Sequence, residues 1–215
     1  MAIHQRITTL AIASFTTLVI ASCRYGPATV KQPGIDPSSA GSLAMEMYDT
    51  NADGKVAGDE LENAPSLKAA VARLDSDGDK SVSADEVAAR IEEWQAMRTG
   101  LMSFGFTVTL NGSPLTDAVV TFEPEVFLGD EIKPASCTTN MFGGGGATIA
   151  KEDRPDPTSP PGMHFGLYKV RISKVAEGAE TIPAKYNAET ILGQEVGPDV
   201  PEIANNRVIY ALSTK

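Results

Sequence analysis

Two short acidic segments, residues 49–60 and 75–86, constrain the fold of this chain more than any other feature of its sequence. Each has Asp or Asn at its positions 1, 3 and 5 and Glu at its last position, 12. A tight loop aims alternate side chains at one centre, so the spacing predicts two compact loops lined by oxygen atoms. The side chains at these positions are Asp49, Asn51, Asp53 and Glu60 in loop one and Asp75, Asp77, Asp79 and Glu86 in loop two.

Both loops resemble the twelve-residue loop of the EF-hand calcium-binding family. Ca²⁺ takes six to eight oxygen ligands at about 2.3–2.6 Å, and an EF-hand loop adds a backbone carbonyl at position 7 to its side-chain ligands. The resemblance implies two Ca²⁺ sites, with the carbonyls of Lys55 and Ser81 completing the two ligand sets. Val56 and Val82 occupy position 8, where paired loops form a short antiparallel bridge.

The loops depart from the family pattern at two positions. Loop one has Gly54 at position 6, where the backbone needs a positive φ, but loop two has Lys80 there. A residue other than glycine at such a position costs about 1 kcal/mol. Loop one has Ala57 at position 9, where a water molecule would replace a side-chain ligand. We expect both loops to bind Ca²⁺, since weak sites of about 10⁻⁴–10⁻³ M suffice outside the cytoplasm.

Helical patterns flank both loops, and residues 42–99 are predicted to form an EF-hand pair. Leu67, Val71 and Leu74 have helical spacing ahead of loop two, and Pro65 separates this helix from the one before it. Ser83 and Glu86 form a capping-box pattern, which predicts a helix from there to about residue 97.

The N-terminus has the pattern of an export signal. An apolar run at residues 7–20 is too short to span a bilayer as a stable helix, and Ile20-Ala21-Ser22-Cys23 follows it. This resembles the lipobox of bacterial lipoproteins, which implies cleavage after residue 22 and a membrane anchor of lipid on Cys23. The resemblance predicts an exported lipoprotein, with the outer membrane favoured because Arg24 rather than Asp follows the cysteine. Residues 23–41 are expected to be a flexible tether.

Residues 103–215 have the alternating pattern of β-strands. Strands are predicted at 106–110, 118–123, 147–149, 166–173 and 207–212, and Asn111-Gly112 is a hairpin turn. The fold class expected is α+β, an EF-hand pair followed by an all-β antiparallel sandwich. The sandwich resembles the carboxypeptidase-regulatory-like or transthyretin-like modules. The residues that carry this resemblance are 108–115, 118–122, 138–140 with Gly143, 161–162 ahead of 168–170, and 182–186.

The amino-acid composition disfavours several classes of function for this protein. The formal net charge of −10 disfavours nucleic acid as a partner and favours cations. Two Cys and two His allow neither a cysteine-rich zinc site nor a disulfide framework, and no nucleophile–base pair is recognisable, so no enzyme is expected. The leading hypothesis is structural Ca²⁺ in a lipid-anchored protein whose sandwich binds an envelope protein or wall polymer. A calcium sensor and, less favoured, an extracytoplasmic hydrolase with structural calcium remain open.

Overall fold

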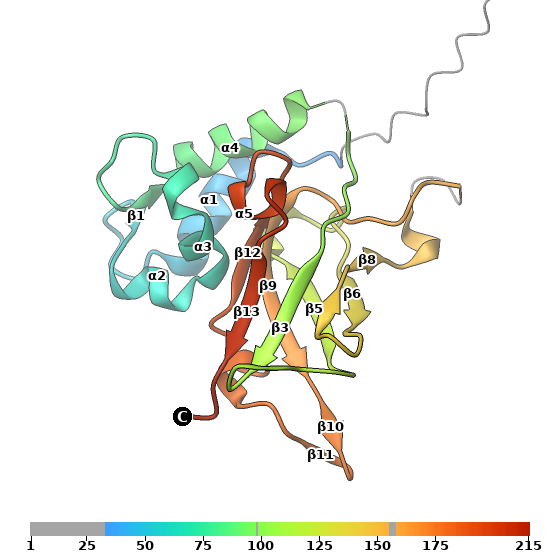
Figure 1. The fold of residues 1–215 in the computed structure, drawn as a ribbon. Helices are drawn as coiled ribbons and strands as arrows, with labels where there is room; N and C mark the ends of the chain where they lie inside the picture. The colour runs from blue at the N-terminus through green and yellow to red at the C-terminus, as the bar shows by residue number, and fades with distance from the viewer. Residues whose placement is uncertain (1–32, 98, 155–157) are drawn as a thin grey trace, which may run out of the picture.

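The computed structural model describes residues 33–97, 99–154 and 158–215, and these have a mixed helix-and-sheet, α+β architecture. Four helices gather on one side of the strands (Figure 1): α1 (Pro37–Tyr48), α2 (Asp59–Asn63), α3 (Pro65–Leu74) and α4 (Ala84–Ala96). The predicted signal segment 1–22 and the predicted lipidation residue Cys23 lie outside the described residues. Within the described ranges, no helix combines the length and the apolar character needed to cross a membrane.

Helix α1 (Pro37–Tyr48) begins inside the segment predicted to be a tether, residues 23–41. Asp36 caps this helix, because its Oδ1 accepts a hydrogen bond from the Ser39 amide at 2.7 Å. Pro37 stands in the first turn, where its fixed φ suits the helix and no N–H is required. The tether prediction is therefore wrong at its C-terminal end, and the helical region starts earlier than expected.

The buried face of α1 consists of the small residues Ala40, Gly41 and Ala44, with Tyr48 at its C-terminal end. Ala44 is fully buried, whereas Leu43 and Met47 are 43% and 40% exposed. Gly41 permits the close approach of α1 to the start of α4, since a Cβ there would lie 2.2 Å from the carbonyl oxygen of Ala84. The first and last helices of the region therefore meet backbone to backbone.

Three further helices flank the two acidic loops, as predicted. Their bounds are α2 (Asp59–Asn63), α3 (Pro65–Leu74) and α4 (Ala84–Ala96). Pro65 begins α3 and separates it from α2, which matches the expected break. Ser83 and Glu86 form the predicted capping box at the start of α4.

Two larger sheets make up the C-terminal part. One has the strand order β12-β9-β5-β6-β8, and the other has the order β13-β3-β4 with β7 also paired to β3. The first sheet contains β5 (Val119–Pro124), β6 (Ala135–Thr138), β8 (Thr148–Ile149), β9 (Gly166–Ser173) and β12 (Gly193–Val196). The second contains β3 (Phe106–Leu110), β4 (Ser113–Pro114), β7 (Gly144–Gly145) and β13 (Val208–Leu212).

The remaining elements are short. Two-residue strands β1 (Lys55–Val56) and β2 (Val82–Ser83) pair with each other, as do β10 (Val175–Ala176) and β11 (Ala179–Glu180). The short helices are η1 (Val126–Leu128), η2 (Lys151–Asp153), η3 (Ala184–Tyr186) and α5 (Pro201–Ala204). The predicted turn at Asn111-Gly112 has φ of 51° and 81° and joins β3 to β4.

One strand pair contradicts the expectation of a purely antiparallel β region. Strand β13 runs parallel to β3, with Val208 opposite Phe106 and Leu212 opposite Leu110. Every other pairing between the described strands of the two larger sheets is antiparallel. Alternation along a strand sets which side chains face inward, but it carries no information on the direction of the neighbouring strand.

The two sheets pack face to face through aromatic side chains. The ring of Phe122 in β5 lies 5.6 Å from that of Phe106 in β3 and 6.3 Å from that of Tyr210 in β13. Both pairs are tilted or edge-on, the arrangement that the ring quadrupoles favour. Phe122 is fully buried, so the core of the β region lies between the two sheets.

The helical and β regions share a packed interface. Helix α3 lies against β12 and β9, and Gly193 of β12 sits directly under the first turn of α3. A Cβ at Gly193 would lie 1.9 Å from the carbonyl oxygen of Pro65, so only glycine fits without a shift of the backbone. The helix that leads into loop two is therefore packed directly on the larger sheet.

Candidate metal centre

The two acidic loops lie side by side. Strands β1 and β2 pair antiparallel, with Val56 opposite Val82 and Lys55 opposite Ser83. Both valines are fully buried, as their position 8 predicts. This bridge places position 8 of one loop opposite position 8 of the other.

The two loops repeat the same hydrogen bonds, position by position. The carboxylate at position 1 accepts from the amides at positions 5 and 6, which closes each loop on itself. In loop one Asp49 accepts from Asp53 at 3.2 Å and Gly54 at 2.8 Å, and in loop two Asp75 accepts from Asp79 at 3.1 Å and Lys80 at 2.9 Å. Such bonds hold the side chain at position 1 toward the interior of its loop.

The closing glutamates also take equivalent places. Glu60 accepts hydrogen bonds from the amides of Thr50 at 2.8 Å and Ala57 at 3.2 Å, and the Ala57 bond is the main cause of its lowered pKa. Glu86 accepts from the amides of Ser76 at 2.8 Å and Ser83 at 2.9 Å. Partial burial of Glu86 opposes ionisation, but these bonds lower its pKa below the usual value. Each glutamate thus reaches from an exit helix back to the start of its loop.

The hydroxyl groups at position 2 were not anticipated as part of the site. Thr50 Oγ1 donates to Glu60 at 2.9 Å, and Ser76 Oγ donates to Glu86 at 3.2 Å. A hydroxyl at the same position of both loops is the sequence feature that could have revealed this contact.

Backbone conformation repeats as well. Position 6 has a positive φ in both loops, 87° at Gly54 and 67° at Lys80, as the sequence predicts. Position 4 is also left-handed, with φ of 58° at Ala52 and 80° at Gly78. Each loop therefore has one glycine and one strained residue at these two positions.

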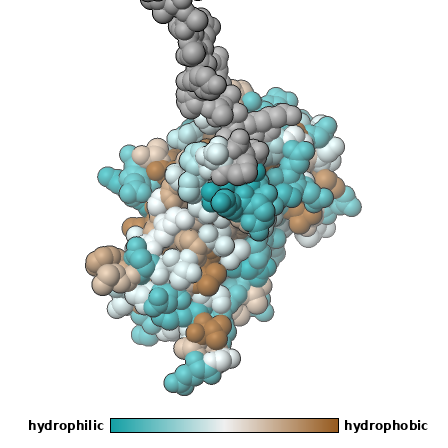
Figure 2. Space-filling model, turned by 90° about the vertical axis from the view of Figure 1, so that its right-hand side faces the viewer, coloured by the Kyte–Doolittle hydropathy of each residue, from teal (hydrophilic) through white to brown (hydrophobic). Residues whose placement is uncertain are grey.

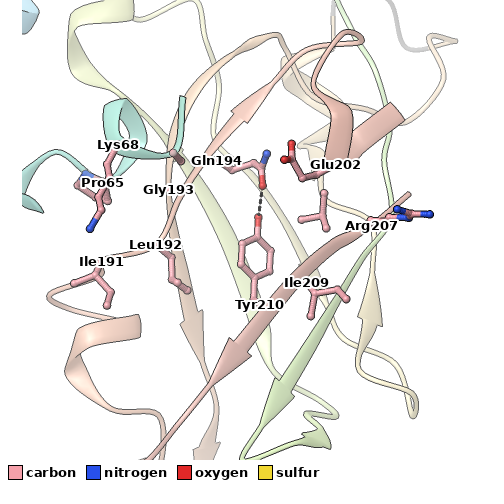
Figure 3. A pocket seen from close by; sticks show the side chains of 12 residues that line it. Pro65, Lys68, Ile191, Leu192, Gly193, Gln194, Glu202, Arg207, Ile209 and Tyr210 are labelled. Carbon is pink, nitrogen blue, oxygen red and sulfur yellow. Dashed lines mark hydrogen bonds between the residues drawn. The ribbon is translucent and has the colours of Figure 1, made fainter. Parts of the chain in front are cut away.

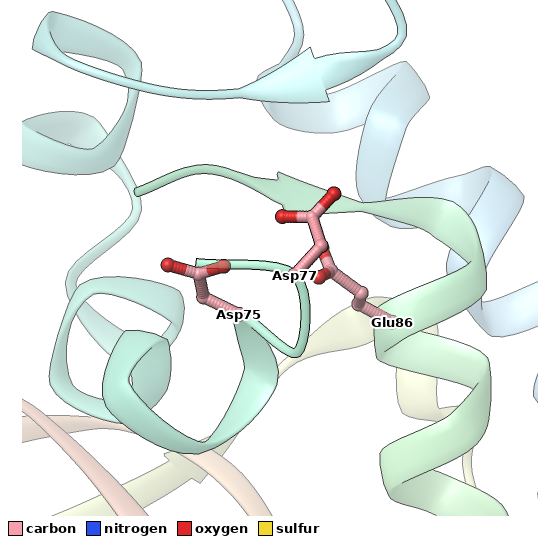
Figure 4. Close-up of side chains that lie close together, drawn as sticks. All are labelled: Asp75, Asp77 and Glu86. Atoms are coloured by element: carbon pink, nitrogen blue, oxygen red, sulfur yellow. The ribbon is translucent and has the colours of Figure 1, made fainter. Parts of the chain in front are cut away.

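Loop two gathers its carboxylates more tightly than loop one. Asp75, Asp77 and Glu86 have ligand atoms within 4.8 Å of one another. Figure 4 shows Glu86 extending from the first turn of α4 toward the loop that carries the two aspartates. Among the described residues, the three carboxylates of loop one do not form such a group. Three carboxylates this close repel one another and favour a cation between them.

A lysine from loop one contacts the remaining carboxylate of loop two. Lys55 Nζ forms an ion pair with Asp79 Oδ2. This ammonium group, together with the hydroxyl of Ser81, lowers the pKa of Asp79 to about 2. The sequence argument used only the carbonyl of Lys55, and the contact arises because pairing of the loops brings its side chain across.

The donor set fits a hard divalent cation. Each loop offers only oxygen ligands, with carboxylates or an amide at positions 1, 3, 5 and 12. Hydrogen bonds from backbone amides hold the carboxylates at position 1 in place, and Lys55 pairs with Asp79 at position 5 of loop two. Ca²⁺ prefers such oxygen-only sites, whereas softer metals prefer nitrogen or sulfur.

A separate pocket lies between α3 and the edges of the two sheets (Figure 3). Its volume is about 460 Å³, and Ile191, Ile209 and Tyr210 line it together with Lys68. The Tyr210 hydroxyl donates to Gln194 Oε1 at 3.2 Å and bridges the two sheets at its floor. The side chains that line this pocket include no Ser, Cys or His.

The sequence matches no protein-family model, and no curated protein or solved structure matches it.

Proposed function

We propose that this protein binds two calcium ions in its paired acidic loops. The repeated hydrogen-bond network supports this most directly. In both loops the residue at position 1 accepts from positions 5 and 6, and the closing glutamate accepts from positions 2 and 9. Solvated acidic turns of unrelated origin would have no reason to repeat this pattern.

The side chains and carbonyls of the loops would hold the ions. In loop one the ligands would be Asp49, Asn51, Asp53, Glu60 and the carbonyl of Lys55, and in loop two Asp75, Asp77, Asp79, Glu86 and the carbonyl of Ser81. Bound Ca²⁺ would supply positive charge that balances the clustered carboxylates. The ions would thereby stabilise the folded state over the unfolded chain.

We infer that calcium has a structural role, because the helices already bury their apolar faces. Leu67 and Leu74 of α3 and Ile91 and Trp94 of α4 are at most 2% exposed. A sensor would have to withdraw such side chains from the core to expose a binding groove. Withdrawal of four large apolar side chains would cost several kcal/mol.

A calcium sensor is the second candidate, and one observation favours it. A pocket of about 500 Å³ lies between α2 and α3, where Leu61 and Val71 meet the loop-two residues Asp75 and Lys80. Binding of an ion in loop two could alter this surface directly. A calcium-dependent rise in the fluorescence of a dye that binds apolar surface would favour this role.

The β region is proposed to be a binding module of the carboxypeptidase-regulatory-like or transthyretin-like type, whose partner is an envelope protein or a wall polymer. Two facing sheets support this resemblance. On the face seen in Figure 2, hydrophobic residues form small separate patches among hydrophilic ones.

The export signal and a lipid on Cys23 remain proposals from the sequence, and radioactive palmitate should label the wild type but not Cys23→Ser.

Titration calorimetry with Ca²⁺ on residues 24–215 tests the proposed function. We expect two sites in the wild type, one in Glu60→Gln or Glu86→Gln, and none in the double variant. Glu202→Gln is the control, because it removes an exposed carboxylate far from the loops in sequence. Absence of heat and of thermal stabilisation at millimolar Ca²⁺ would refute the proposal, and two sites in the double variant would refute the ligand assignment.

A further inference from the structure

A single buried carboxylate joins the two helices on either side of loop two. Glu195, in β12, is fully buried. Its Oε2 pairs with Nε of Arg73, and its Oε1 accepts a hydrogen bond from Nε of Arg90 at 2.6 Å. Arg73 is in the last turn of α3, and Arg90 is in α4. One residue of the sheet therefore contacts the helix that enters loop two and the helix that leaves it.

The two arginines are close in sequence to the first and last proposed ligands. Arg73 precedes Asp75 by two residues, and Arg90 follows Glu86 by one helical turn. Helices transmit position rigidly over one turn. The place at which Glu195 holds each arginine therefore limits how far apart Asp75 and Glu86 can lie.

The contacts around Arg90 make this arrangement stiff. Its guanidinium also pairs with Asp199 at 2.8 Å and lies 5.7 Å from the ring centre of Trp94. Arg90 is 5% exposed, and its other carboxylate partner is Glu93. The Arg90–Glu195 pair resists separation because both side chains are buried, and each would be left unpaired away from water, whereas Asp199 and Glu93 are exposed.

Loop one is supported differently among the residues that the structure describes. Glu125 accepts a hydrogen bond from Tyr48, at the end of the helix that enters loop one, but its other partners are Ser66 and Lys169, and neither belongs to α2, the helix that leaves the loop. The ion pairs found near it are Lys55–Asp79, which leads to loop two, and the exposed pair Lys68–Glu62. The carboxylates also lie closer together in loop two, where ligand atoms of Asp75, Asp77 and Glu86 are within 4.8 Å of one another. The loop whose two helices share a buried partner is therefore also the loop whose carboxylates converge.

We propose that Glu195 is a positioning residue for the calcium site of loop two, acting through Arg73 and Arg90 to fix the separation of Asp75 and Glu86 before the ion binds. The inference rests on the proposed function. It adds that strand β12, through Glu195, sets the Ca²⁺ affinity of loop two and does not affect the Ca²⁺ affinity of loop one. Loss of residues that support metal ligands lowers metal affinity by about 10- to 100-fold.

The test measures each loop alone, by calorimetry on residues 24–215. In a Glu60→Gln background only loop two binds, and in a Glu86→Gln background only loop one binds. We expect Glu195→Gln to weaken Ca²⁺ binding about tenfold or more in the first background and to leave the second unchanged. A merely structural role for Glu195 would lower the melting temperature without this selectivity.

A second variant keeps the proposal testable if Glu195→Gln does not fold. Arg73→Gln changes a partly exposed side chain and keeps the Arg90–Glu195 contact. It should weaken loop two alone, and Arg73→Lys should recover part of the affinity. Arg171→Gln is the matched control, because it breaks an Arg–Glu pair of 2.6 Å to Glu123 in the β region.

The two proposals fail in different ways. Wild-type protein that binds no Ca²⁺ would overturn the proposed function and this inference together. Wild-type protein with two sites, and Arg73→Gln with unchanged loop-two affinity, would overturn only the positioning role of Glu195. Equal weakening of both loops would overturn it as well.

Discussion

The hydroxyl of Tyr48, the last residue of α1, donates a 2.8 Å hydrogen bond to the buried carboxylate of Glu125. Glu125 also accepts a hydrogen bond from Ser66 Oγ at the start of α3 and pairs with Lys169 of β9 at 3.7 Å. Burial, followed by the charge and the hydrogen bond of Glu125, raises the pKa of Tyr48 well above its usual range. This carboxylate ties the helix ahead of loop one to the β region, as Glu195 does for loop two.

Tyr48→Phe should destabilise the protein by about 1.5–3 kcal/mol, since it removes a hydrogen bond to a buried charged group and leaves the carboxylate short of one donor. Urea denaturation in the presence of a calcium chelator measures this free energy of unfolding. The control is Tyr186→Phe, because the Tyr186 hydroxyl accepts a 3.2 Å bond from the neutral Ser213 amide. Equal losses in the two variants would contradict the importance of Glu125.

Lys55→Met should tighten Ca²⁺ binding by loop two about two- to fivefold, because the ammonium group competes with the ion for Asp79 and an exposed ion pair is worth up to about 1 kcal/mol. The measurement is calorimetry in the Glu60→Gln background. Lys151→Met, which removes an exposed lysine of η2, serves as the control. Weaker binding in Lys55→Met would show that the lysine aids the site.

Lys80→Gly should make the protein more stable than Lys80→Ala by about 0.5–1 kcal/mol, because the backbone of residue 80 has a φ of 67°. Both variants remove the charge, so the difference between them isolates backbone strain. Gly54→Ala provides the mirror experiment in loop one, where φ is 87° and a Cβ would meet no atom within 4 Å. It should lose a similar amount, and equal stability of Lys80→Gly and Lys80→Ala would exclude strain at this position.

The free energy of unfolding should decrease as the pH is lowered below about 6.5, because the side chain of His164 is buried and resists protonation in the folded state. Burial, and then the charge of Lys133, lower the pKa of this histidine in the folded state. The unfolded chain therefore binds a proton at a pH where the folded protein does not, so the free energy of unfolding decreases with falling pH until the folded pKa is reached.

The variant His164→Gln checks the origin of this pH dependence. Denaturation of residues 24–215 at pH 7.5, 6.5 and 5.5 with a chelator should show a smaller slope in the variant. His164 is the only histidine in these residues, and carboxylates titrate mainly below this range. An unchanged slope would assign the effect to other groups.

The sequence predicted the local elements of this fold well. The break at Pro65, the capping box of Ser83 and Glu86, and the positive φ of Lys80 depend on residues within a few positions of one another. The strands at 106–110 and 166–173 were also placed correctly, since alternation marks the buried face. The start of α1 was missed, although the cap of Asp36 followed by Pro37 was present to be used.

Strands without a clear alternating pattern were not predicted. Strand β12 has only four residues, and one of its three buried side chains is the charged Glu195. A Glu in a sequence is normally taken as exposed, so nothing local indicated that this one pairs with two arginines.

The amino-acid order alone determined the two oxygen-lined loops and their flanking helices, because the hydrogen bonds within each loop join residues at most ten positions apart. The tertiary structure decided the parallel placement of β13 and the burial of Glu125 and Glu195. These depend on partners 44 to 122 positions away, from Lys169 with Glu125 (169 − 125 = 44) to Arg73 with Glu195. Which surfaces meet over such distances depends on the packing of the whole chain, and a local pattern carries no record of it.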